Sequence, residues 1–242
     1  MTLPTRRLPG SIGFWGLALT FWLCPSVWAA RPMNTDDANV VDPGACQLES
    51  WVKTTRQGQE RWALPGCNLG LDIEWTLGGA LQNLSGEATR WTQFQAKKRW
   101  RKLEPGDVGV ATSVGLVDVQ GRGASGLSPQ QDRYLNVPMS WASTAGPIVH
   151  LNVGWVEHRL PTPAVTHGTW GLGAEVPVSA QLFLIGETYR EQRETSRWQV
   201  GLRRWIVPQK LQIDSTIGQP AGAAQGQRWL TIGVRWLGDP LF

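Results

Sequence analysis

Apolar and polar residues alternate along most of this chain, in segments of about ten residues separated by turn residues. The clearest segment is LGLDIEWTLGGAL, in which Ile73, Trp75 and Leu77 share one face and polar residues share the other. Because side chains two residues apart lie on the same side of a strand, each segment predicts a strand with one apolar and one polar face. Twelve strands are expected, near residues 45–55, 59–65, 69–81, 88–101, 108–118, 133–142, 147–158, 166–176, 180–190, 196–207, 210–218 and 227–237.

The links between these segments discriminate between two all-β folds. Short links are expected at 65–66, 104–107, 144–146, 177 and 208–209, and longer links, richer in Gly and polar residues, at 81–87, 119–132, 159–165 and 219–226. Short periplasmic turns that alternate with longer outer loops are typical of bacterial outer-membrane barrels, which have an even number of strands. A soluble β-sandwich has no reason to keep this alternation. The pattern therefore predicts an all-β, antiparallel transmembrane β-barrel of about 12 strands, of the outer-membrane type.

The N-terminus predicts a secretory signal peptide. Arg6 and Arg7 precede an apolar run at 12–23 that is too short for a transmembrane helix, and Ala29 offers a small residue for cleavage. A signal peptide is consistent with the expected location, the outer membrane of a Gram-negative bacterium. The expected domains are the signal peptide at 1–29, an N-terminal extended segment at 30–44 and the barrel at 45–242.

Two groups of charges lie near the expected periplasmic end. The segment 30–44 is expected at the periplasmic mouth, where Asp36 and Asp37 could bind a cation or cap the lumen, although solvated carboxylates are the simpler expectation. The basic run at 97–102 is expected to be a solvated strand end, with Trp100 at the membrane interface.

Composition excludes two other classes of protein. The formal net charge is +4, and removal of the two arginines of the signal peptide leaves 21 basic and 19 acidic residues, a net charge of only +2, so no nucleic-acid partner is expected. No apolar run near 20 residues follows the signal peptide, which excludes helical membrane spans. The chain has 28 Gly and 15 Trp, three of which lie in the signal peptide, and this tryptophan content suits the aromatic girdles of a barrel.

Cys46 and Cys67 are the cysteines that follow the signal peptide. If the first hairpin turns near residues 56–57, the two cysteines lie opposite each other on adjacent strands. The periplasm forms disulfides, so we expect a disulfide that staples the hairpin. A redox pair or a metal site would need a CxxC spacing or nearby histidine ligands, and neither is present.

Charged residues on the polar faces are expected to point into the lumen, because Arg or Lys facing lipid at the midplane costs ~2–4 kcal/mol. We expect Arg197 and Glu187 to pair near the outer end of the ninth hairpin. Charges of both signs could line a water-filled pore or interlock as a sealed ladder, and the sequence does not separate these two cases. The predicted lumen-facing residues are Glu49, Asp72, Glu74, Glu175, Glu187, Arg197, Arg203, Asp214 and Arg235.

The histidines raise one enzymatic alternative. We expect His158 and His167 to approach each other at the outer rim, and the stretch from His150 to Asn152 holds two residue types that a serine hydrolase uses beside its nucleophile. No nucleophile motif accompanies them. The expectation is therefore a protein that is not an enzyme, with no catalytic residue, cofactor or metal, and an outer-membrane lipid hydrolase stays as the rival that His→Ala variants would test.

The stretches ARPMNTDDANVVDPGACQLESWV, WALPGCN, LDIEWTLGGAL, KLEPGDVGVATSVG and LRRWIVPQKLQID resemble proteobacterial outer-membrane proteins similar to the family named putative MetA-pathway of phenol degradation. The resemblance implies an outer-membrane barrel that carries small solutes, including aromatic ones. The last strand and the terminal Phe242 resemble the signal by which barrels reach the barrel-assembly machinery, although Gly238, Asp239 and Pro240 interrupt it. We therefore expect a passive channel or transporter embedded in outer-membrane lipid, with a sealed structural or scaffold barrel as the alternative.

Overall fold

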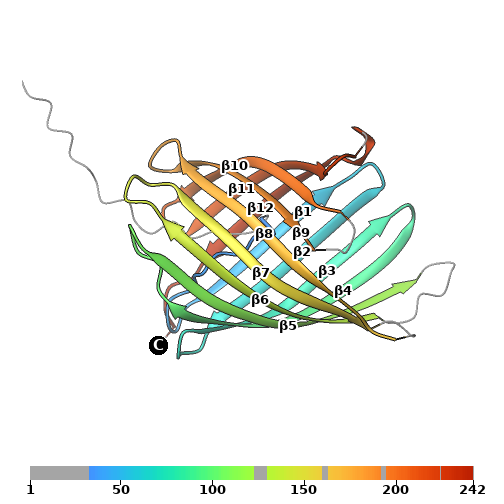
Figure 1. Cartoon of the computed structure of the whole chain (residues 1–242), viewed down its shortest axis with the longest axis horizontal. Helices are drawn as coiled ribbons and strands as arrows, with labels where there is room; N and C mark the ends of the chain where they lie inside the picture. The colour runs from blue at the N-terminus through green and yellow to red at the C-terminus, as the bar shows by residue number, and fades with distance from the viewer. Residues whose placement is uncertain (1–32, 123–129, 160–162, 192–194, 224, 242) are drawn as a thin grey trace, which may run out of the picture.

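The chain forms one closed barrel of twelve antiparallel strands, in which every strand pairs with its neighbours in sequence and the first pairs with the last (Figure 1). This computed structural model describes residues 33–122, 130–159, 163–191, 195–223 and 225–241, so the expected signal peptide and Phe242 lie outside the described residues. The strands are β1 Cys46–Thr54, β2 Gly58–Asn68, β3 Ile73–Leu84, β4 Glu87–Arg101, β5 Val108–Arg122, β6 Gln130–Ala142, β7 Ile148–Arg159, β8 Val165–Pro177, β9 Leu182–Arg190, β10 Arg197–Val207, β11 Leu211–Pro220 and β12 Trp229–Leu237. A short 3-10 helix, η1 Gln225–Gln227, precedes β12.

The predicted strand number and fold class are confirmed, but two predicted links are wrong. Residues 65–66 lie inside β2, which continues to Asn68, and the chain turns at 69–72 instead. The link between β3 and β4 is only Ser85 and Gly86, both with positive φ, and not a long loop over 81–87. A two-residue turn of this conformation matches the twist of the strands it joins, so this hairpin needs no longer connection.

The barrel has two distinct ends. The end where β1 begins and β12 finishes, here called the terminal end, also carries the links 69–72, 102–107, 143–147, 178–181 and 208–210. The opposite end, here called the loop end, carries the links 55–57 and 85–86 and the connections that follow β5, β7, β9 and β11. Two links at the loop end are thus as short as turns, so the expected alternation of short and long links is only partly present.

The outer face of the barrel is apolar. Along β12, Leu230, Ile232, Val234 and Trp236 are 36–54% exposed, while the residues between them are buried, as the alternation predicts. Such an outer face is the surface that a membrane barrel turns to lipid. Among the described residues no helix is long and apolar enough to cross a membrane.

The interior at the terminal end is partly apolar, which the sequence pattern left open. In β9, Phe183 and Ile185 are 1% exposed while Leu184 is 50% exposed, so the uninterrupted apolar run of this strand still has one inward and one outward face. An apolar cluster therefore fills part of the barrel near this end, and it consists of Met33, Leu103, Ala142, Ile148, Phe183, Ile185 and Trp205.

Candidate functional site

Residues 33–45, here called the inner segment, run through the barrel interior at the terminal end and connect directly to β1. The segment contains no strand, yet most of its side chains are buried. Ala38, Val40 and Val41 are at most 1% exposed, and Asp37 is only 2% exposed. An irregular segment with these exposures needs partners for its backbone, because a buried N–H group without a hydrogen bond costs free energy.

Those partners are side chains on several strands of the barrel. The Thr35 N–H donates to a Glu187 carboxylate oxygen at 2.6 Å, and the Val41 N–H donates to Glu74 at 2.9 Å. The Asp36 N–H donates to Asn152 Oδ1, while Asn152 Nδ2 donates back to the Asp36 carbonyl oxygen at 2.7 Å. The inner segment is therefore held by β3, β7 and β9 at once.

An ion pair from β4 adds a fourth anchor. Lys97 Nζ lies 2.9 Å from Asp36 Oδ1 and 3.3 Å from Asp37 Oδ1, and the Lys97 side chain is 6% exposed. The predictions of solvated carboxylates in the inner segment and of a solvated basic strand end are thus wrong for Asp37 and Lys97. Alternation places Lys97 and Arg99 on the inner face of β4, where the inner segment supplies the counter-charge.

Glycines on the inner face of β8 make room for the inner segment. A Cβ added at Gly171 would lie 2.6 Å from Thr35 Oγ1, and one added at Gly173 would lie 2.6 Å from Met33 Cε. These distances are shorter than any stable contact, so side chains at these two positions and the inner segment cannot share the same space. Gly171 and Gly173 therefore leave the space that the inner segment occupies inside the barrel.

Gly171→Val is expected to displace the inner segment without breaking the barrel, because Thr35 is short and has no flexible arm that can turn away. The expected result is a larger ion current across a planar bilayer than the unchanged protein gives. Gly168→Val is the matched control on the same strand, since a Cβ there meets only the Gly154 carbonyl oxygen at 3.9 Å. Equal currents from both variants would show that the glycine does not hold the segment in place.

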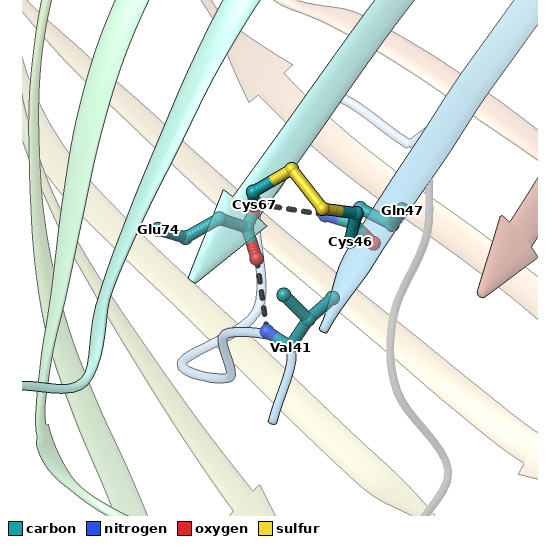
Figure 2. The surroundings of a disulfide bond; sticks show 5 residues. All are labelled: Val41, Cys46, Gln47, Cys67 and Glu74. Atoms are coloured by element: carbon teal, nitrogen blue, oxygen red, sulfur yellow. Dashed lines mark hydrogen bonds between the residues drawn. A yellow bond between two sulfur atoms is a disulfide. The ribbon is translucent and has the colours of Figure 1, made fainter. Parts of the chain in front are cut away.

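The predicted disulfide is confirmed, and it lies beside the inner segment (Figure 2). Cys46 and Cys67 are bonded and lie directly opposite each other on β1 and β2. In Figure 2 the Glu74 carboxylate lies between the Val41 N–H and Gln47 Nε2, which donates to it at 2.7 Å. The disulfide therefore holds the start of β1, which follows the inner segment, close to Glu74, one of the residues that bind the segment.

A buried cluster of two carboxylates and one arginine lies on the opposite wall. Arg203 Nη1 lies 2.6 Å from Glu175 Oε1, and Arg203 Nε donates to Asp214 Oδ1 at 2.9 Å. All three side chains are 0% exposed. Gln212, on the same strand as Asp214, donates to both Asp214 oxygens. The ion pairs of Arg203 link β10 to β8 and to β11.

A serine, a histidine and a glutamate continue this network to the inner segment. Ser140 Oγ lies 2.7 Å from His150 Nδ1, and His150 Nε2 lies 3.1 Å from Glu175 Oε1. The same Ser140 oxygen accepts the Ala38 N–H at 2.9 Å. A lipid hydrolase would need this serine at the lipid boundary, whereas the three side chains are at most 1% exposed inside the barrel. Their geometry serves to anchor the inner segment.

The remaining predicted lumen residues lie at several places. Arg235 faces Glu49 across β12 and β1, at 3.7 Å, and donates to Gln47 at 2.7 Å. Asp72 is in the turn before β3, where its side chain is 40% exposed and lies 2.6 Å from Arg99, so it belongs to the rim and not to the lumen wall.

The predicted pair of Arg197 and Glu187 is replaced by two other interactions. The register places Glu187 opposite Gln199, which donates to it at 2.6 Å, and Arg197 opposite Tyr189. Arg197 lies 3.7 Å from Glu191 instead. The prediction from the sequence is wrong because a two-residue difference in the register of β9 and β10 decides which side chains lie opposite each other.

The half of the interior toward the loop end is lined by aromatic rings. Trp51 and Trp62 stack with ring centroids 5.3 Å apart and planes inclined by 8°, and Trp91 lies 6.1 Å from Trp62 at 49°. We call these three residues the tryptophan cluster. By alternation they share the inner faces of β1, β2 and β4 with buried polar residues, and all three are half-buried. The prediction that the tryptophans form outer girdles is therefore wrong for these three residues, which face the interior.

The two rim histidines meet as predicted. The rings of His158 and His167 are stacked with centroids 5.0 Å apart, and His158 Nδ1 lies 2.9 Å from Asp132 Oδ1. Within the described ranges, no three His, Cys, Asp or Glu side chains are arranged to hold a metal ion.

Residues 18–236 match the family model described as Uncharacterised conserved protein UCP029691. The chain belongs to this family. No protein with a curated description matches the sequence. The phenol-degradation family that the turn pattern resembles gains no support from these comparisons, whereas the barrel fold that the resemblance implies is confirmed.

Two porins of known structure have a similar fold. The KdgM porin in complex with disordered oligogalacturonate superposes with a TM-score of 0.54 at 10% sequence identity, covering 78% of this chain and 98% of that chain. The NanC porin superposes with a TM-score of 0.52 at 11% identity, covering 79% of this chain and 98% of that chain. With this fold and an apolar outer face, the family member described here is an outer-membrane β-barrel of the Gram-negative type.

One signal for the occupied interior was present in the sequence of this family member. In β8 the inward positions read Gly171, Gly173 and Glu175, and in β4 they read Gln93, Gln95, Lys97 and Arg99. Small residues on the inner face of one strand and long polar residues on that of another indicate that something inside the barrel is packed and paired.

Proposed function

We propose that the protein is an outer-membrane channel for small solutes, with the inner segment as a constriction at its terminal end. The observation that carries the proposal is the way in which the segment is held. Its contacts with Glu187, Asn152, Lys97 and Glu74 are hydrogen bonds and ion pairs, which water and solute can replace. A segment that served only as a core would be expected to bury apolar side chains against an apolar wall along its whole length.

The tryptophan cluster supports a finer proposal about the solute. Aromatic faces inside a lumen attract other rings, because offset-stacked and edge-to-face pairs are worth ~0.5–1.5 kcal/mol beyond the area they bury. Trp51, Trp62 and Trp91 lie deeper than the rim and on the loop side of the inner segment. A ring-bearing solute that enters from the loop end would reach them before the constriction. Small aromatic compounds are therefore the proposed solute class.

The test is the ion current through the purified, folded protein in a planar bilayer, with phenol or cyclohexanol added on either side. We expect stepwise currents that phenol reduces at lower concentration than cyclohexanol, which has the same size but no aromatic face. In Trp62→Leu the half-blocking concentration of phenol should rise roughly threefold to tenfold, the loss expected for one ring contact.

The matched control for this test is Trp141→Leu, because Trp141 is 47% exposed and lies on the outer face by alternation with the buried Ser140. This control should block as the unchanged protein does. Equal blocking by phenol and cyclohexanol would remove the aromatic class and leave the channel.

A second candidate is a sealed structural barrel, favoured by the way Met33 of the inner segment packs with Phe183 and Trp205 in the apolar cluster that fills part of the interior. If the barrel is sealed, the folded protein should carry no current, and neither should a variant without the inner segment. The two candidates therefore differ in a single measurement.

A further inference from the structure

The outer wall near the loop end carries a row of four directly paired residues across four adjacent strands. Arg61 of β2 pairs with Leu81 of β3, Leu81 pairs with Arg90 of β4, and Arg90 pairs with Gln120 of β5. All four side chains are exposed, and alternation with inward residues places them on the outer face. We call these four residues the arginine row.

The arginine row lines a hollow of about 860 Å³, together with Gln59 and Asn83 of the next row toward the loop end. Neighbouring strands lie ~4.8 Å apart, so the backbones of Arg61 and Arg90 are ~10 Å apart across the hollow. The residues that line it carry basic, amide, hydroxyl or apolar groups, and none of them is acidic.

The two guanidinium groups lack carboxylate partners within the described part of the chain. Arg61 Nη2 donates to Gln59 Oε1 at 3.2 Å, a neutral acceptor. Asp118 is the acidic residue of the adjoining outer row, and it accepts a hydrogen bond from Gln120 at 2.8 Å. The salt bridges of the described residues include neither Arg61 nor Arg90. Two positive charges therefore face the same hollow, and no carboxylate of the described residues is paired with either of them.

The position of the arginine row along the strands indicates which anion Arg61 and Arg90 contact. Four residues further toward the terminal end, Leu77, Phe94 and Leu116 form a row that is 41–61% exposed and apolar. This distance is ~13 Å along the strand, so the arginines lie where the apolar outer face gives way to polar residues. Leu81, 64% exposed, lies between the two arginines and can contact an acyl chain. The row thus combines apolar and cationic groups at the level of lipid headgroups.

We propose that the arginine row binds the phosphate groups of a lipopolysaccharide molecule in the outer leaflet. The planar guanidinium fork matches phosphate oxygens in two-point contacts, and Arg keeps its charge at every physiological pH. Both described chain ends lie at the terminal end, and in bacterial barrels the longer outer loops lie opposite the short periplasmic turns, so the loop end faces the outer leaflet. This site lies on the outside of the barrel and does not depend on whether the lumen conducts.

The test is lipopolysaccharide binding to the purified full-length barrel in phosphatidylcholine nanodiscs, measured with fluorescently labelled lipopolysaccharide. The double variant Arg61→Gln and Arg90→Gln should bind about tenfold more weakly, because it loses charge-assisted hydrogen bonds. Arg204→Gln, an exposed arginine near the terminal end, is the matched control and should bind unchanged. Circular dichroism and the heat-dependent shift in gel mobility show whether each variant is folded.

Four outcomes would overturn the proposal. The first is equal binding by the folded double variant, and the second is equal binding of lipopolysaccharide from which the phosphates have been removed. Competition by millimolar inorganic phosphate that displaces all the bound lipid would identify a site for the free anion instead. Binding of phosphatidylglycerol as tight as that of lipopolysaccharide would show that the row recognises charge without recognising this lipid.

Discussion

Deletion of residues 33–41 is expected to raise the single-channel conductance several-fold over that of the unchanged barrel. The deletion removes the chain that Glu74, Lys97 and Glu187 hold across the interior, and it leaves Cys46 and β1 intact. With these side chains released into water, the terminal end keeps the wall residues and only the last four residues of the inner segment, 42–45. The measurement is the current step in a planar bilayer, with folding checked by the heat-dependent gel shift.

A reversible lock provides the control for this deletion. A Cβ at Gly171 would lie 3.3 Å from the Thr35 Cβ, close to the ~3.5–4.5 Å that a disulfide spans. The double variant Thr35→Cys and Gly171→Cys should therefore conduct least when oxidised and recover after reduction. The unchanged protein, reduced in parallel, controls for loss of the Cys46–Cys67 bond. A deletion variant that is folded but carries no current would contradict the channel and support the sealed barrel.

Arg203→Met is expected to lower the free energy of unfolding by roughly 3–5 kcal/mol, the usual loss when one partner of a buried ion pair is removed. The substitution leaves Glu175 and Asp214 facing each other with no positive charge, although both are 0% exposed. Two buried carboxylates without a counter-charge must take up protons or admit water. The measurement is denaturant unfolding of the barrel in lipid vesicles, followed by tryptophan fluorescence.

The neighbouring Arg204 provides a control with the same change in side chain. Arg204 is exposed on the outer face, and Arg204→Met should change stability by less than about 1 kcal/mol, as expected for an exposed charge. The triple variant Arg203→Met, Glu175→Gln and Asp214→Asn removes all three charges and should recover part of the loss. If Arg203→Met were as stable as Arg204→Met, the buried cluster would not be the source of the stability.

The local features of this barrel could be predicted from the sequence because hairpins are local. A strand alternates with period two, and its neighbour follows after a short turn, so the faces of β12 and the opposition of Cys46 and Cys67 follow from nearby residues. The errors lie where local rules allow two answers. The link at Ser85 and Gly86 can turn in two residues, and the β9–β10 hairpin can place either Arg197 or Gln199 beside Glu187.

The sequence by itself determined the all-β class, the number of strands, the apolar outer face and the disulfide, because each depends on periodicity or on neighbouring segments. Only the tertiary structure decided what lies inside the barrel. The inner segment has no period, and its partners are far away in the chain, 152 residues for Thr35 and Glu187 and 102 residues for Ala38 and Ser140. Closure of the twelve strands into a barrel brings these side chains together in its interior, and only then do Lys97 and Asp37 form a buried pair.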